Sequence, residues 1–318
     1  MKGGRIYKIM VLVTGASGLI GAALCKALRE RSSSVIPCSR NPVSAGWVKY
    51  DATQPIDYDF GVDVIVHAAS PASPDLFVSN PVETLMANVY GLQQLLEYAR
   101  RCGAKKVVYV SSSEVYGNVP PRENGFLETD YGVVDVLNPR SSYPMGKRAA
   151  ETLCASYVAE YGLDVSIVRP GHIYGPTCSE QDKRVSSAFP WLAARGLPIV
   201  MKSDGAQIRS YTHADDCARA IIKVIECGMP GEAYNIAARC GKCSIRQMAE
   251  IVARAGGVEL KFELPSGVES AAFNPMNNSC LDPSKLEALG WRGEIRPERG
   301  FEETVVALRK ELENKERK

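Results

Sequence analysis

A glycine-rich turn near the start of the chain joins an apolar strand to a helix. Residues 9–13 are an apolar run typical of a buried parallel strand, and residues 19–28 have a helical pattern. Between them lies the segment Thr14-Gly15-Ala16-Ser17-Gly18-Leu19-Ile20-Gly21. Glycines at this spacing allow a tight turn, close approach of the backbone to a pyrophosphate, and close packing of helix on strand. The helix N-terminus then faces the anion, so the segment predicts a dinucleotide-binding α/β fold.

Apolar runs and helical patterns alternate through the first half of the chain, which indicates a parallel sheet. Further strands are expected over residues 34–38, 48–50, 63–67, 106–111 and 165–169, and helices over residues 81–101 and 140–161. Ligands bind at the carboxyl ends of the strands in such a sheet, where Ser17, Asp51, Ala68 and Ser112 are expected. The predicted fold class is therefore α/β, with a Rossmann-type, doubly wound parallel sheet in residues 1–170.

Beyond residue 170 the alternation loosens. Residues 171–183 are rich in Gly, Pro and polar residues and are predicted to be a loop. Helices are expected over residues 213–226, 245–255, 283–289 and 299–312, and a strand over residues 259–264. Residues 171–318 are therefore expected to be organised differently from the first domain.

A second pattern, between residues 112 and 147, carries chemistry. Tyr143 stands four residues before Lys147 in a predicted helix, so the two side chains share a face about 6 Å apart along the axis. A positive charge beside the phenol favours its ionised form, so Tyr143 is expected to act as a base well below its free pKa of about 10. The hydroxyl of Ser112, at a strand end, can hydrogen-bond the same substrate oxygen. The three residues predict a proton-relay site for oxidising an alcohol.

The two motifs, in this order, resemble the extended short-chain dehydrogenase/reductase family, which includes nucleotide-sugar epimerases, dehydratases and decarboxylases. Several stretches are most similar to UDP-glucuronate decarboxylases; they are residues 67–74, 111–117, 139–140, 146–148 and 184–187. The resemblance implies that Ser112, Tyr143 and Lys147 are catalytic. It also implies that a retained nicotinamide cofactor oxidises the sugar at C4. Residues 171–318 then resemble the family's substrate-binding lobe, which is interleaved with the first domain.

The residues beside Ser112 bear on the fate of the sugar after its C4 oxidation. Ser113 stands where the family's 4,6-dehydratases have an Asp, and Ser is a poor proton donor, so dehydration lacks its acid. Glu114 matches the decarboxylases and is expected to act on the substrate. Ser113 and Glu114 therefore join Ser112, Tyr143 and Lys147 as the candidate catalytic residues. Glu114 is also open to a structural role, paired with a neighbouring Arg or Lys. A 4-epimerase and a 4,6-dehydratase remain the alternatives, and a non-catalytic cofactor-sensing protein is a remote one.

The cofactor prediction leaves NAD and NADP nearly even. The second strand ends in Ser39 and Arg40, without the acid that reads the ribose 2′-hydroxyl of NAD, and Arg40 suits a 2′-phosphate. The most similar family members use NAD, and there Asp51 resembles the acid that reads the adenine amino group. The full set of expected cofactor-binding residues is Gly15, Ser17, Gly18, Leu19, Ile20, Gly21, Ser39, Arg40, Asp51, Ala52, Ala68, Ala69, Ser70, Asn88, Tyr143, Lys147 and Pro170.

The resemblance also implies a set of substrate-binding residues, namely Pro71, Glu114, His172, Arg184 and Arg209. The chain departs from the family at two places. His172 stands where the family often has Asn, and residues 273–277 lack the Arg that grips the diphosphate or sugar. The nucleotide and the sugar therefore stay open.

The bulk properties exclude several classes of protein. The net charge of +2 implies no nucleic-acid partner, and the absence of an apolar run of about 18 residues implies no membrane span. The short apolar run after residue 5 is not a signal peptide, and ten scattered cysteines indicate reduced thiols, so a cytoplasmic location is expected. Cys240 and Cys243 form a lone C-x-x-C pair, which is a poor metal site, so no metal is expected.

Assembly is expected through the two long helices of the first half. Residues 81–101 and 140–161 carry apolar residues at helical spacing, among them Leu85, Leu92, Leu95 and Leu96. Members of the resembled family pair these helices with their copies about a two-fold axis. A homodimer with an isologous four-helix contact is the expected form.

Overall fold

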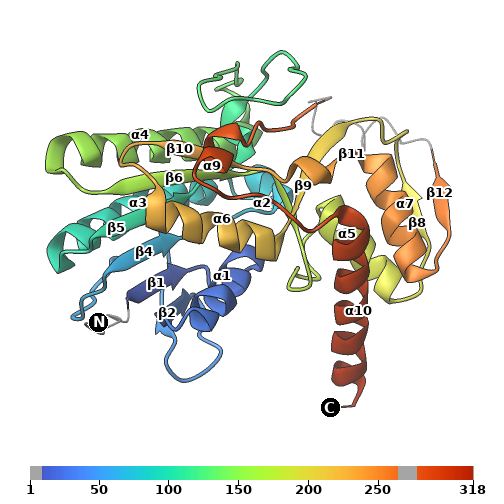
Figure 1. Ribbon diagram of the computed structural model, residues 1–318, viewed down its shortest axis with the longest axis horizontal. Helices are drawn as coiled ribbons and strands as arrows, with labels where there is room; N and C mark the ends of the chain where they lie inside the picture. The colour runs from blue at the N-terminus through green and yellow to red at the C-terminus, as the bar shows by residue number, and fades with distance from the viewer. Residues whose placement is uncertain (1–8, 264–277, 318) are drawn as a thin grey trace, which may run out of the picture.

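The computed structural model describes residues 9–263 and 278–317. At its centre is a seven-stranded sheet in the order β10-β6-β5-β4-β1-β2-β3, in which every pair of neighbours is parallel (Figure 1). Its strands are β1 (Met10–Thr14), β2 (Ser34–Ser39), β3 (Val48–Lys49), β4 (Val64–His67), β5 (Lys106–Val110), β6 (Val165–Pro170) and β10 (Ala233–Ile236). The predicted doubly wound parallel sheet is confirmed.

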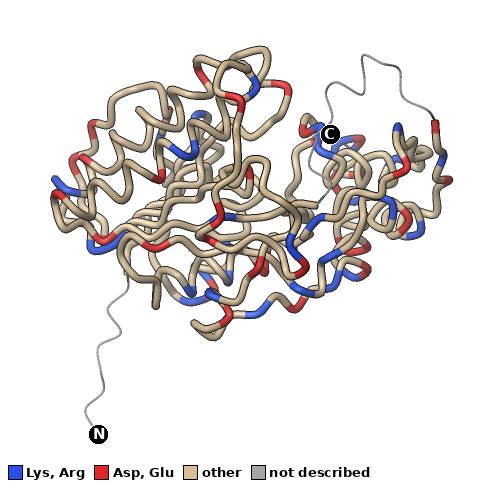
Figure 2. Tube along the Cα trace, turned by 90° about the horizontal axis from the view of Figure 1, so that it is seen from above, with Lys and Arg blue, Asp and Glu red and all other residues tan. Residues whose placement is uncertain are grey.

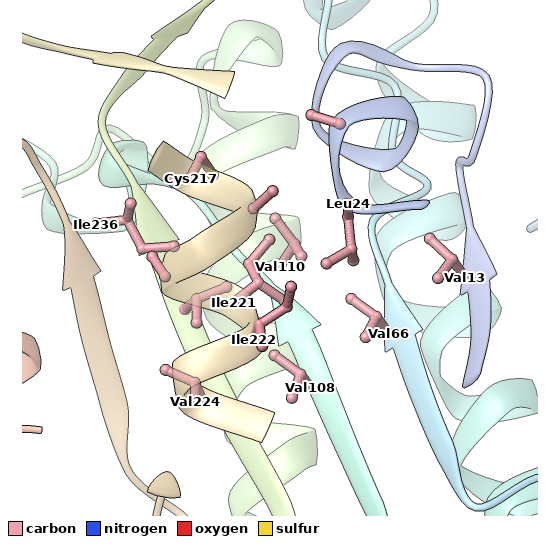
Figure 3. Packing of buried hydrophobic residues seen from close by; sticks show 14 of the residues in the cluster. Val13, Leu24, Val66, Val108, Val110, Cys217, Ile221, Ile222, Val224 and Ile236 are labelled. Carbon is pink, nitrogen blue, oxygen red and sulfur yellow. The ribbon is translucent and has the colours of Figure 1, made fainter. Parts of the chain in front are cut away.

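Two pairs of helices cover the two faces of this sheet. They are α1 (Leu19–Glu30) and α6 (Ala214–Cys227) on one face, and α3 (Pro81–Cys102) and α4 (Ser142–Tyr161) on the other. Because successive side chains of a strand point to opposite faces, β1 supplies both cores: Val11 and Val13 pack with the first pair and Leu12 with the second. Figure 3 shows Ile221 and Ile222 of α6 beside Val108 and Val110 of β5. Both faces are thus buried, which explains why the strands are continuous apolar runs.

The second half of the chain contributes to both parts of the molecule. Its lobe holds β7 (His172–Tyr174), β9 (Ile208–His213) and β11 (Lys242–Ser244) in one small sheet, β8 (Ile199–Met201) and β12 (Leu260–Phe262) in another, and α5 (Val185–Ala194), α7 (Ile245–Gly256) and α10 (Pro297–Glu316). The three helices enclose a core that includes Trp191, Met248 and Phe301 (Figure 1). However, α6 and β10 return to the large sheet, and α9 (Ser284–Ala288) packs beside β10.

Several short elements were not predicted. Residues 171–183 were expected to be a loop, which is wrong for 172–174, because β7 pairs there with β9. Six more helices and strands were missed: α2 (Pro74–Ser79), β8, β9, β10, β11 and α5. The strands β8, β10 and β11 have only three or four residues each, which is too short to show a period, and their partner strands lie far away in the sequence. The expected strand over 259–264 is β12, and residue 264 lies outside the described residues.

Three short segments position residues beside the sheet. The helix α2 (Pro74–Ser79) follows β4, and the 3-10 turns η1 (Ser113–Tyr116) and η2 (Pro139–Ser141) precede α4. The helix expected over 140–161 therefore begins as a 3-10 turn and becomes α-helical at residue 142. These segments bring their side chains to the carboxyl ends of β4 and β5.

The surface carries both signs of charge, spread over the whole molecule (Figure 2). In the described parts of the chain, no helix combines the length and the apolar character needed to cross a bilayer. The ten cysteines are all free thiols. Cys240 Sγ lies 3.7 Å from the carbonyl oxygen of Gly293, and over residues 9–263 and 278–317 no group of three or more potential ligand side chains could hold a metal ion.

Candidate active site

The glycine turn leaves no room for side chains at two of its positions. Gly15 has a φ of +70°, and a Cβ there would lie 2.8 Å from the backbone of Ala68 and Ala69. A Cβ on Gly21 would lie 2.1 Å from the carbonyl oxygen of Gly15. Gly18 is the N-cap of α1 and has no side chain to cover the first turn of the helix. The first turn also lacks an acidic residue, so its backbone N–H groups are suited to an anion.

Two cavities meet at this turn. The larger, about 520 Å³, lies over the ends of β2 and β3 and includes Arg40 and Asp51 in its wall. The other, about 350 Å³, lies over the ends of β5 and β6 and includes Tyr143 and Lys147. The residues common to both walls are Gly15, Ser17, Gly18, Ala68 and Ser70. A dinucleotide laid across the turn would place one half in each cavity, so the residues present fit such a cofactor.

All but one of the expected cofactor-binding residues line these cavities. Leu19, Ile20, Gly21 and Pro170 are in the wall of the smaller one, and Ser39, Ala52 and Ala69 in that of the larger. The exception is Asn88, which is buried and lines neither. Its side-chain oxygen accepts a hydrogen bond from Ser70 Oγ at 2.9 Å, and its amide donates to the Thr84 carbonyl at 2.7 Å. Asn88 therefore acts through Ser70.

At the end of β2 a cation and an anion lie near each other. Asp51 accepts hydrogen bonds from the backbone and hydroxyl of Thr53 at 2.9 and 2.8 Å, and these lower its pKa, with Arg40 and Lys49 adding to the effect. Ser39 Oγ donates to the Asn41 carbonyl at 2.8 Å. The larger cavity thus offers a carboxylate that stays ionised and an exposed guanidinium.

Tyr143 is buried at the bottom of the smaller cavity. Its ring stacks on Phe77 of α2, with centroids 4.2 Å apart and an interplanar angle of 7°. The pKa of Tyr143 is raised to about 12, mainly by burial and in part by the Glu114 charge, while hydrogen bonds from Ser112 and Ser70 and the charge of Arg184 act in the opposite direction. A depressed phenol pKa was expected from the nearby lysine, and the structure shows the opposite. The cost of burying a phenolate outweighs the attraction of nearby cations.

Lys147 lies on the same face of α4, as its spacing predicts. Its Nζ donates to the Val110 carbonyl oxygen at 2.8 Å and lies 5.7 Å from the centroid of the Tyr143 ring. Burial lowers the pKa of Lys147 to about 7, against the opposing charge of Glu151. The side-chain amine is thus bonded to the end of β5.

Glu114 is held by an ion pair. Its two carboxylate oxygens accept hydrogen bonds from Nη1 and Nη2 of Arg140 at 3.1 and 3.2 Å, and its backbone N–H donates to Ser112 Oγ at 3.2 Å. Neither Glu114 nor Ser113 lines either of these two cavities, and Ser113 is buried. This ion pair with Arg140 agrees with the alternative in which Glu114 has a structural role beside a neighbouring Arg or Lys.

The expected substrate residues are only partly brought together. Arg184 lines the smaller cavity, where the Asp182 carboxylate accepts from its Nε at 2.9 Å, and Pro71 lines the larger. His172 and Arg209 line neither of the two cavities. Burial, Arg209 and Arg184 together lower the pKa of His172 to about 3, so this imidazole is neutral. Arg209 is buried, and its Nη1 donates to the Ile208 carbonyl at 2.9 Å.

Sequence reasoning missed two groups at the site. Phe77 and Arg140 flank Tyr143 and Glu114. Arg140 belongs to a stretch of family resemblance, residues 139–140, whereas no sequence pattern pointed to Phe77. Ser179, Gln181 and Asp182 line the cavity from the loop before α5. The Asp182-x-Arg184 spacing, which suits a local ion pair, was the available signal for that loop.

Comparisons with known proteins agree with this geometry. The sequence profile of the NAD dependent epimerase/dehydratase family matches residues 11–237. The chain is 30% identical over 305 residues to UDP-glucuronic acid decarboxylase 6 of Arabidopsis thaliana, covering 92% of this chain and 86% of that protein. Two solved structures resemble the whole fold. The UDP-glucose 4-epimerase of Thermus thermophilus in complex with NAD has a TM-score of 0.79 at 26% identity and covers 95% of this chain and 99% of that one.

The dTDP-glucose 4,6-dehydratase of Streptomyces venezuelae, with NAD bound, has a TM-score of 0.78 at 25% identity. The match covers 95% of this chain and 97% of that one. The match to the family profile spans most of the chain, and it includes the glycine turn, the Tyr143 and Lys147 pair, and the strands that carry them. This chain belongs to the NAD dependent epimerase/dehydratase family.

Proposed function

We propose that the protein oxidises the C4 hydroxyl of a nucleotide sugar with a retained nicotinamide cofactor, and then decarboxylates an acidic sugar as UDP-glucuronate decarboxylases do. The observation that carries this proposal is the shared cavity: Ser112, Tyr143 and Lys147 line the same wall as the glycine turn, with Arg184 in that wall too. The decarboxylase at 30% identity supports the choice of substrate.

The chain's own residues account for proton transfer. A bound nicotinamide supplies the hydride acceptor and, later, the donor. Tyr143 takes the proton of the C4 hydroxyl, and the hydroxyls of Ser112 and Ser70, which hydrogen-bond the phenol, hold it in line. Lys147 lies on the same face of α4, and its protonated form favours the phenolate. Burial excludes water from the phenol, since Tyr143 is 7% exposed.

The 4-keto sugar formed by that oxidation can then lose CO2. A C4 ketone is β to the C6 carboxylate, so the C5–C6 bond breaks, CO2 leaves, and the electron pair passes into a C4 enolate that is protonated at C5. Arg184 is the guanidinium in the cavity wall and suits the carboxylate or the diphosphate. Dehydration is disfavoured because Ser113, in the place of the dehydratases' acid, is buried and lies outside the cavity.

A 4-epimerase is the second candidate. Glu114 is engaged by Arg140, so the described site offers no free carboxylate beside Ser112, and epimerisation after C4 oxidation needs none. The two functions differ in their products. Purified protein would be incubated with UDP-glucuronate, UDP-glucose and dTDP-glucose, and the CO2, the product masses and the free reduced cofactor would be measured. We expect CO2 from UDP-glucuronate alone and no lasting rise in reduced-nicotinamide absorbance; epimerised UDP-glucuronate without CO2 would reject decarboxylation.

The identity of the cofactor is part of the proposal. The pair Arg40 and Asp51 serves either form: the guanidinium suits the 2′-phosphate of NADP, and the carboxylate suits the adenine amino group. Mass spectrometry of the cofactor released from denatured protein decides between NAD and NADP. The ten free thiols support the cytoplasm, a reducing compartment, as the location.

We also propose a homodimer through α3 and α4. Val82, Leu85 and Met86 lie at helical spacing on α3 and are 70%, 37% and 49% exposed, so they form an apolar stripe on the outside of this layer. An isologous contact with a second copy would cover it. Light scattering at micromolar concentration should show a dimer, and Met86→Glu should shift it towards monomer. A monomeric wild type would reject the contact.

A further inference from the structure

Arg140 lies between two groups that both reach Tyr143. On one side its guanidinium holds both oxygens of Glu114, at 3.1 and 3.2 Å. On the other side it lies 5.8 Å from the centroid of the Phe77 ring, within the range of a cation–π contact. Phe77 in turn stacks flat on Tyr143 at 4.2 Å. One planar cation therefore joins the carboxylate and the ring on which the phenol rests.

The surrounding backbone holds Arg140 in this place. Its N–H donates to Asn138 Oδ1 at 3.0 Å, which caps the η2 turn. Ser142 Oγ donates to the Phe77 carbonyl at 3.1 Å, which ties α2 to the start of α4. α2 has only six residues and cannot hold its shape alone, so the position of Phe77 depends on these contacts.

We propose that Arg140 is a positioning residue of the active site: it clamps Phe77 against Tyr143 and holds Glu114 in an ion pair that offsets part of its charge. This inference rests on the proposed function where it is tested by enzyme kinetics. It assigns Glu114 an electrostatic effect on Tyr143 that Arg140 controls, in addition to any contact with the substrate.

The charges around Tyr143 give the direction of the effect. The groups that face the phenol are Glu114 from η1, Arg184 from the segment before α5, Lys147 from α4, Tyr109 from β5, and the hydroxyls of Ser112 and Ser70. Among these, Glu114 is the anion. An unpaired carboxylate disfavours the phenolate, and the ion pair with Arg140 offsets that charge. Removing Arg140 should therefore make Tyr143 harder to ionise, and removing the Glu114 charge should make it easier.

The kinetic test compares Arg140→Gln, Glu114→Gln and the double variant. Single-turnover reduction of the bound cofactor by UDP-glucuronate would be followed against pH. We expect the rising limb of the Arg140→Gln profile to move to higher pH by on the order of one pH unit. At a fixed pH on that limb, the rate would then be about tenfold lower than in the wild type. In Glu114→Gln the rising limb should move to lower pH. The double variant should have the same profile as Glu114→Gln, because Arg140 then has no carboxylate charge to offset. Arg140→Lys should recover part of the shift.

Arg246→Gln is the matched control. Arg246 also pairs with a carboxylate, Glu250 at 3.1 Å, and lies over an aromatic ring, Phe262 at 4.7 Å, but in α7 and away from the cavity. Its profile should match the wild type. Superimposed profiles of Arg140→Gln and wild type, an equal shift in the control, or a double variant that follows Arg140→Gln would each overturn the proposal.

A second readout needs no substrate. In protein with ring-labelled tyrosine, the NMR signals of Tyr143 are assigned by their loss in Tyr143→Phe. The Phe77 ring, stacked at 4.2 Å, displaces them by its ring current. Arg140→Gln should reduce that displacement and Arg246→Gln should leave it unchanged; an unaltered Tyr143 signal in Arg140→Gln would reject the clamp. A wild type inactive on every nucleotide sugar would contradict the proposed function, while this spectrum still decides the role of Arg140.

Discussion

Replacing Gly21 by Ala tests whether the glycine turn is fixed by packing. Gly21 lies in the first turn of α1, where Ala would by itself favour the helix by up to about 1 kcal/mol. The added Cβ, however, would lie 2.1 Å from the Gly15 carbonyl oxygen, whereas real Cβ atoms keep at least 3.0 Å from such a neighbour. The difference, 3.0 − 2.1, means that helix and turn must separate by about 0.9 Å.

The size of the effect can be worked out from that displacement. The contact is with backbone, so no side chain can rotate away, and overpacking of this kind costs about 1–3 kcal/mol. After the gain in helix propensity, we expect the free energy of unfolding to fall by about 1–2 kcal/mol. A turn moved by nearly an ångström also misplaces the N–H groups at Gly18, so cofactor affinity should fall at least about tenfold, which is about 1.4 kcal/mol.

Two assays separate these effects. Urea denaturation of cofactor-free protein measures the stability, and mass spectrometry of denatured protein measures the cofactor retained. Gly61→Ala is the control, because a Cβ there meets nothing closer than the Cys102 carbonyl oxygen at 3.7 Å, and it should change stability by no more than about 0.5 kcal/mol. A Gly21→Ala protein as stable as the wild type, with full cofactor content, would refute the packing argument.

Three further predictions concern buried polar residues, two of them in the site and one pair elsewhere in the core. Tyr143→Phe should lower CO2 release from UDP-glucuronate by on the order of a hundredfold or more with cofactor content unchanged, and near-normal turnover would remove Tyr143 from the role of base. Burial lowers the pKa of Lys147 from 10.5 to about 7, so the unfolded chain binds more protons between those values and the free energy of unfolding rises with pH across that window. Urea curves at about pH 7.5 and about pH 9.5 should show this slope in cofactor-free wild type and not in Lys147→Met; equal slopes would contradict it. Glu151→Ala leaves the guanidinium of Arg169, 2.6 Å away and 3% exposed, unpaired, and should cost about 3–5 kcal/mol in urea denaturation, whereas Lys105→Ala, at an exposed pair, should cost at most about 1 kcal/mol.

The fold was predictable wherever a pattern is local and long enough to show its period. The strands β1, β4 and β5 are continuous apolar runs, and α3 and α4 carry about twenty residues of helical spacing each, so their type and order could be predicted from sequence. β10 was missed because it has four residues and pairs with β6, far away in the chain. The short strand β7 lies in a segment rich in Gly and Pro, which predicts a loop and shows no strand periodicity.

At the site, the sequence by itself determined the parts that chain neighbours build. The spacing of Tyr143 and Lys147 puts them on one helical face, and the glycine spacing makes the turn, because helix and turn geometry depend on adjacent residues. Only the tertiary structure decided which distant groups surround them: Phe77 under the phenol, Arg140 on Glu114, and Asn88 behind Ser70. It also reversed the expected pKa shift of Tyr143, since burial is the sum of contacts from many elements and no local spacing encodes it.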